Sequence, residues 1–80
     1  MATAEQETET DDVHKIEQYF FDYLTGKRDE DWAIAFIADV KIRGQELRNI
    51  FNSVYDGMER TDTREERARR IRRRLDQNGL

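Results

Sequence analysis

The sequence predicts a small all-α domain, a bundle of three to four short helices. Apolar residues recur at helical spacing in several segments, acidic residues stand where helices begin, and no proline interrupts the 80-residue chain. A chain of this size buries about 60–65% of its unfolded surface, so its core is small. Because the chain contains no cysteine, no disulfide stabilises that core, and homo-oligomerisation is a further possible source of burial.

The chain divides into an acidic tail, residues 1–12, and a single helical domain, residues 13–80. The tail carries Glu and Asp but no branched or aromatic apolar side chain. Such a stretch does not bury enough surface to offset the entropy of ordering, so we expect it to be disordered.

The first helix should run from about Val13 to Leu24. Its apolar residues repeat at helical spacing, and the following Thr25-Gly26 is a stop signal. Asp11 or Asp12 is expected to cap its N-terminus. Tyr19 and Phe21 fall off the main apolar stripe, so we predict that they contribute to a partner interface.

A second helix should begin at the acidic segment 29–31 and form the most buried part of the bundle. Trp32 and Phe36 are assigned to the core, together with Phe20 and Phe51. The apolar residues of this region also alternate, which is typical of a strand. The alternative is therefore an α+β fold with a hairpin at 18–42, although the alanine content and the acidic start favour a helix.

The last two helices are expected from about Gln45 to Tyr55 and at about 63–77. The third has the cleanest amphipathic pattern of the chain and follows Gly44. The fourth begins with a capping-box pattern, either Thr63 with Glu66 or Asp62 with Glu65, and Gly79 is placed to end it. Its apolar seam is narrow, so it should lie on the bundle without forming its centre. The seam residues are Ala68, Ile71 and Leu75.

The C-terminal helix is rich in arginine: seven of the eleven residues in 64–74 are arginine, giving this run a charge of +5 in a chain of net charge -4. Guanidinium groups bind phosphate and carboxylate bidentately. The run resembles the arginine-rich RNA-binding peptides, a compositional resemblance over about eleven residues, which implies a helix surrounded by arginines that contacts phosphates. The predicted nucleic-acid-binding residues are Arg64, Arg67, Arg69, Arg70, Arg72, Arg73 and Arg74.

The sequence favours a small non-enzymatic accessory or regulatory protein that contacts the phosphate backbone of RNA or DNA. The alternative is a protein–protein interaction module or a subunit, in which the basic helix docks on an acidic protein. Internal neutralisation by the acidic tail or by pairs such as Glu66–Arg70 would oppose both uses. A helix-turn-helix is not supported, because placing Gly44 or Gly57 in the turn puts polar residues where apolar ones must pack.

Catalytic chemistry is not expected. Ser53 and His14 are the only serine and histidine of a chain without cysteine, so the residues of a nucleophilic catalytic site are lacking. The four glycines are far apart in the sequence, so a glycine-rich phosphate-binding loop is not expected. We expect no cofactor and no metal site. The start of the chain lacks the pattern of a secretory signal, and the longest apolar run, 32–38, is too short for a membrane span, so a cytoplasmic protein without a membrane role is expected.

Overall fold

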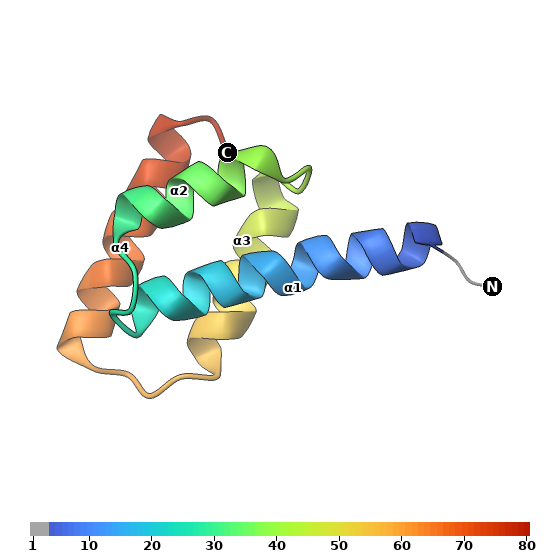
Figure 1. Cartoon of the computed structure of the whole chain (residues 1–80). Coiled ribbons are helices and arrows are strands. Elements are labelled where there is room, and N and C mark those ends of the chain that lie inside the picture. Colours follow the sequence, from blue (N-terminus) through green and yellow to red (C-terminus); the bar gives the residue numbers. More distant parts are fainter. Residues whose placement is uncertain (1–3) are drawn as a thin grey trace.

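The structure is a computed structural model that describes residues 4–80, with side chains described from residue 12. It is a bundle of four helices (Figure 1). The helices are α1 (Ala4–Leu24), α2 (Glu30–Asp39), α3 (Gly44–Asp56) and α4 (Asp62–Gln77). The described residues contain no strand, so the all-α prediction is confirmed and the alternative hairpin at 18–42 is wrong. The alternation in that segment arises because α2 carries apolar residues on two faces.

α1 is the central helix, because it packs against each of the other three. It starts nine residues before the expected Val13, and its backbone is helical through the proposed cap positions Asp11 and Asp12. Its N-terminal part projects past the other helices, as Figure 1 shows. Of the acidic tail predicted for residues 1–12, residues 1–3 lie outside the described residues, and side chains are described only for residue 12.

The core lies where α1 crosses the other helices, and all four contribute to it. Phe20 and Phe51 are fully buried, and their rings meet edge to face with centroids 4.9 Å apart. The predicted seam of α4 is also buried, as expected. The buried residues are Ile16, Phe20, Tyr23, Leu24, Ala33, Ile34, Ile37, Val40, Leu47, Phe51, Tyr55, Ala68, Ile71 and Leu75.

The predicted orientation of α2 is wrong. Its inward face is formed by Ala33, Ile34 and Ile37, whereas Trp32 is half-buried and Phe36 is 42% exposed. α2 is the shortest helix and packs on both α1 and α4, so it is not the centre of the bundle. The small Ala33 side chain permits this close packing, while the two large rings remain at the outer edge of α2.

The helix ends follow local sequence rules. α1 and α4 both end in a Schellman motif with a glycine at positive φ, Gly26 (85°) and Gly79 (70°), as the stop signals predict. Asp29 caps α2 by accepting a hydrogen bond from the Trp32 backbone N–H at 2.8 Å. The α4 cap is Thr61, whose Oγ1 accepts from the Arg64 N–H at 3.2 Å. The expected capping box is therefore wrong, because the helix starts one residue earlier and places an arginine at the third helical position.

Candidate nucleic-acid interface

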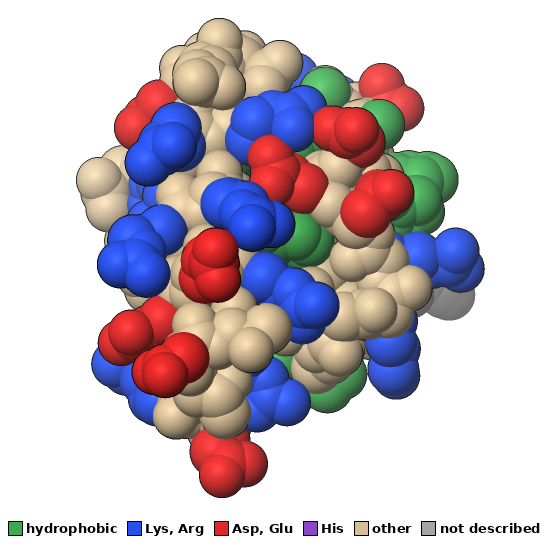
Figure 2. Space-filling model, turned by 90° about the vertical axis from the view of Figure 1, so that its left-hand side faces the viewer, with side chains coloured by type: hydrophobic (Ala, Val, Ile, Leu, Met, Phe, Trp, Pro, Cys, Tyr) green, Lys and Arg blue, Asp and Glu red, His purple; other side chains and the backbone are tan. Residues whose placement is uncertain are grey.

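α4 exposes arginines on every side that does not face the core. Figure 2 shows the side of the molecule on which α4 lies. Basic side chains extend there from top to bottom, with acidic side chains between them. The apolar seam of α4 is anchored on the core, so the positions of the arginines on the helix are fixed. Their guanidinium groups nevertheless differ in what they contact, and these contacts decide which of them are available to a partner.

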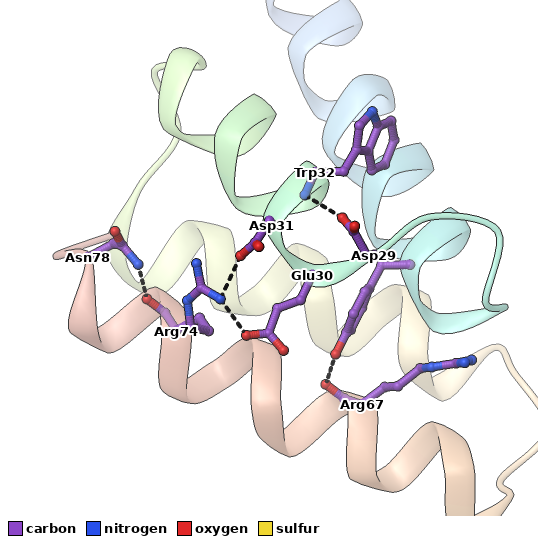
Figure 3. A network of polar contacts seen from close by, with 8 residues as sticks. Asp29, Glu30, Asp31, Trp32, Arg67, Arg74 and Asn78 are labelled. Carbon is purple, nitrogen blue, oxygen red and sulfur yellow. Dashed lines mark hydrogen bonds and ion pairs between the residues drawn. The ribbon is translucent and has the colours of Figure 1, made fainter.

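Arg74 ties α4 to the start of α2 (Figure 3). Its Nη1 donates to Oε2 of Glu30 at 2.7 Å and lies 2.9 Å from Oδ1 of Asp31. The hydrogen bonds to Asp31 and Glu30 raise the pKa of the Arg74 guanidinium above its usual value, so its charge is held. The Arg74 side chain is 33% exposed and that of Glu30 is 20% exposed. Arg74 therefore acts mainly as a structural link.

Arg67 lies against the loop that follows α1. Its Nη1 donates to the Leu24 carbonyl oxygen at 3.3 Å, and its guanidinium occupies the space beside Gly26 that a Cβ would enter. The Arg67 carbonyl oxygen accepts a hydrogen bond from the Tyr23 hydroxyl at 3.0 Å. These contacts fix α4 on α1, while the bond to a neutral carbonyl leaves the positive charge of Arg67 uncompensated.

The Tyr23 hydroxyl is held neutral by its surroundings. Burial raises its pKa to about 12, and the carboxylate of Glu30 acts in the same direction. The positive charges of Arg70, Arg67 and Arg74 oppose this shift without cancelling it. Tyr23 is therefore a hydrogen-bond donor to α4 throughout the physiological pH range.

Arg64 and Arg72 also bind neutral oxygens. Arg64 Nη1 donates to the Glu59 carbonyl oxygen at 3.1 Å, and Arg72 Nη2 donates to Oδ1 of Asn52 at 3.0 Å. The Arg72 guanidinium also lies over the Phe51 ring, 5.0 Å from its centroid. Both side chains are positioned by the fold, and neither pairs with a carboxylate among the described residues.

The remaining arginines face outward. Arg70 Nη2 lies 3.2 Å from Oε2 of Glu66 in an i,i+4 pair, but both side chains are about 60% exposed, and such a pair contributes only about 0.3–0.5 kcal/mol. Arg69 and Arg73 are exposed and form no hydrogen bond or ion pair with the described residues. No described residue competes with an external anion for these two guanidinium groups.

The predicted binding residues do not form one face of α4, because five of the seven line two grooves on different flanks of the helix. On one flank, Arg67, Arg70 and Arg74 line a groove of about 490 Å³ between α4 and the loop after α1, which we call the basic groove. On the other flank, Arg69 and Arg72 line a smaller groove of about 310 Å³ beside α3. Either groove is open enough to admit a phosphate group.

The fold adds three basic residues that sequence reasoning missed. Lys27 and Arg28 line the basic groove, and Arg60 lines the groove beside α3, where its Nη2 donates to Oδ1 of Asp56 at 2.9 Å. Lys27 and Arg28 adjoin the glycine stop of α1, which was a visible signal of a loop position. Their proximity to α4 depends on tertiary packing, which no local pattern contains.

The structure does not bring the predicted interface residues Tyr19 and Phe21 together. Tyr19 contacts the α2 rings of Trp32 and Phe36, whereas Phe21 is 40% exposed in a groove between α1 and α3. Two residues separated by two positions lie on nearly opposite sides of a helix, which explains the separation.

Other kinds of site receive no support within the described residues. They hold no group of three His, Cys, Asp or Glu side chains able to bind a metal ion. None of their helices has the length and apolar character that crossing a bilayer requires. Comparison of the chain with protein-family models, with curated proteins and with solved structures gave no match. Function must therefore be argued from the geometry of α4.

Proposed function

We propose that this protein is a small non-enzymatic nucleic-acid-associated accessory or regulatory protein that contacts phosphates through α4. The observation that carries this proposal is the partnering of the seven arginines in 64–74. Only Arg70 and Arg74 pair with carboxylates among the described residues, so five guanidinium charges are not neutralised by those residues. Planar guanidinium groups bind phosphate oxygens in a bidentate manner, so these arginines suit a phosphate backbone.

The exposed arginines would make the first contacts. Arg69 and Arg73 form no hydrogen bond or ion pair with the described residues. Arg70 can leave its exposed ion pair with Glu66 and bind a phosphate at a small cost in free energy. The acidic side chains between the arginines and the net charge of -4 oppose binding of a polyanion. The affinity should therefore be moderate and should fall steeply as salt rises.

The test is fluorescence anisotropy with labelled RNA and DNA at about 50 and 200 mM salt. We expect binding in the micromolar range or tighter at the lower salt concentration and a clear loss at the higher one. The double substitution Arg69→Glu and Arg73→Glu should weaken binding strongly, because it reverses the charge of two exposed arginines that have no hydrogen-bond or ion-pair partner among the described residues. The control, Lys15→Glu with Lys41→Glu, makes the same change in net charge at exposed positions outside α4.

Three outcomes are informative. Loss of binding in the α4 variant alone supports contact through α4. Equal loss in both variants would show that only the net charge matters. Absence of binding by the unsubstituted protein at low salt would refute the proposal.

The second candidate is a protein–protein interaction module or subunit whose basic helix docks on an acidic protein. The exposed rings of Phe21 and Phe36 favour it, because exposed large apolar side chains are common at interfaces. Light scattering at several protein concentrations tests self-association. A strict monomer that binds nucleic acid, and no acidic polypeptide such as polyglutamate, would exclude this candidate.

A further inference from the structure

Three aromatic rings form a cluster at the outer edge of the α1–α2 packing. Tyr19 and Trp32 meet edge to face with centroids 5.2 Å apart, and the Phe36 ring lies 5.1 Å from each of them. Phe36 is the most exposed of the three, while Tyr19 and Trp32 are half-buried. Tyr19 and Trp32 pack against the core from its edge, so the exposed part of this aromatic cluster is formed mainly by Phe36.

Arg28 connects the aromatic cluster to the basic groove. Its Cζ lies 5.3 Å from the centroid of the Trp32 ring, and the same residue lines the groove with Lys27, Arg67 and Arg70. In Figure 3 the Trp32 ring points away from α4, so the cluster and the groove occupy successive parts of the surface around the start of α2. Hydrophobic side chains gather toward the right-hand edge of Figure 2, beside the charged side chains of its centre.

The carboxylates of the basic groove are largely engaged. Asp29 accepts a hydrogen bond from the Trp32 backbone N–H, and Glu30 and Asp31 share the guanidinium of Arg74. The groove is lined by five basic and three acidic residues, so its lining has a net charge of +2. An anion entering it therefore meets Lys27 and Arg28 at one side and the arginines of α4 at the other.

We infer that the nucleic acid bound by this protein is single-stranded, with bases stacked on the aromatic cluster and phosphates directed through Arg28 into the basic groove. This inference rests on the proposed function. Proteins that bind single strands combine a positively charged groove with aromatic side chains on which bases stack. In a duplex the base faces are covered by their neighbours, so an aromatic cluster beside a basic groove serves only an unpaired strand.

Trp32 provides a direct probe, because it is the only tryptophan in the chain. The intact protein is titrated with a short polyuridine strand, a short polythymidine strand and a duplex of matched charge, while tryptophan fluorescence and anisotropy are recorded. Stacking on the cluster should quench the fluorescence with both single strands and leave it unchanged with the duplex. The single strands should also bind more tightly.

Phe36→Ala tests the cluster and Phe21→Ala is its matched control. Both residues are phenylalanines of nearly equal exposure, but Phe21 lies in the groove between α1 and α3, outside the cluster, and its contact with the basic groove is with Lys27, whose Nζ lies 5.7 Å from the Phe21 ring centroid. Phe36→Ala should weaken single-strand binding roughly 5- to 150-fold, the range expected for the loss of one stacked base. The salt dependence should be unchanged, because no phosphate contact is removed. Phe36→Leu, which keeps an apolar side chain, serves if the alanine variant fails to fold.

The outcomes separate this inference from the proposed function. Equal binding of duplex and single strand without quenching, and no effect of either Phe36 variant, would overturn the single-strand inference and leave phosphate contact through α4 standing. No binding of any nucleic acid would overturn both. A fall in molecular mass caused by Phe36→Ala, measured by light scattering without nucleic acid, would assign the cluster to a second copy of this chain and overturn the inference.

Discussion

Tyr23 and Tyr55 form a matched pair for testing how α4 is attached to the bundle. Both side chains are buried, with exposures of 3% and 6%. The Tyr23 hydroxyl donates to the Arg67 carbonyl oxygen, whereas the Tyr55 hydroxyl has no hydrogen-bond partner among the described residues. Tyr23→Phe should therefore lower the free energy of unfolding at pH 7 by about 0.5–1.5 kcal/mol. Tyr55→Phe should leave it unchanged or raise it, because a buried unpaired hydroxyl is removed.

The effect of Tyr23→Phe should depend on pH in a defined direction. The folded-state pKa of Tyr23 is raised from 10.0 to about 12, so the unfolded chain loses its proton first as pH rises. Below pH 10 this difference in pKa does not change the free energy of unfolding. Between pH 10 and 12 it lowers the free energy of unfolding of the unsubstituted protein. At a pH near 11 the cost is about 1.4 kcal/mol, the equivalent of one pKa unit. Phenylalanine does not titrate, so the variant should equal or exceed the parent in stability there.

Urea denaturation at pH 7 and near pH 11, followed by circular dichroism, measures both effects. The informative quantity is the difference in the free energy of unfolding between the variant and the parent, because other groups titrate equally in both. A difference that stays the same at the two pH values would refute the assignment of the raised pKa to a buried Tyr23 hydroxyl. Equal losses in the Tyr23 and Tyr55 variants at pH 7 would refute the hydrogen bond to α4.

Two further substitutions test the contacts that seat α4. Gly26→Ala should lower the melting temperature more than Gly79→Ala. Both glycines have positive φ in a Schellman motif. A Cβ at Gly26 would lie 3.0 Å from Arg67 Nη1, whereas a Cβ at Gly79 would meet nothing within 4 Å. Equal losses, on the order of 1–2 kcal/mol, would mean that only backbone strain matters. Arg74→Ala should lower the urea midpoint more than Arg73→Ala, because it removes the guanidinium that Glu30 and Asp31 of α2 share. Equal midpoints for the two variants would show that the bridge to α2 contributes no stability.

The helices were predictable because their determinants are local. Apolar spacing, the acidic start of α2 and the glycine stops after α1 and α4 all lie within a few residues of the structure they specify. The boundaries were less predictable. Thr61 is the N-cap of α4 because its backbone is extended and its hydroxyl oxygen accepts a hydrogen bond from the Arg64 N–H. The residues after Thr61 match the capping-box sequence pattern better, but they lie inside the helix.

The candidate site was predictable in its composition and not in its geometry. The arginine run identifies α4 as the basic element, but the sequence does not show which of its seven guanidinium groups pair with carboxylates. Packing distinguishes them, because Arg74 faces the acids of α2 while Arg69 and Arg73 face away from the bundle.

The sequence by itself determined that this chain forms helices and concentrates positive charge on the last one. Only the tertiary structure decided that α2 turns Ile34 inward and leaves Phe36 outside, and that Arg28 joins that aromatic cluster to the groove along α4. The reason is that a helix with apolar residues on two faces has two possible orientations of comparable burial. The shapes of the neighbouring helices, which lie far away in sequence, select between them.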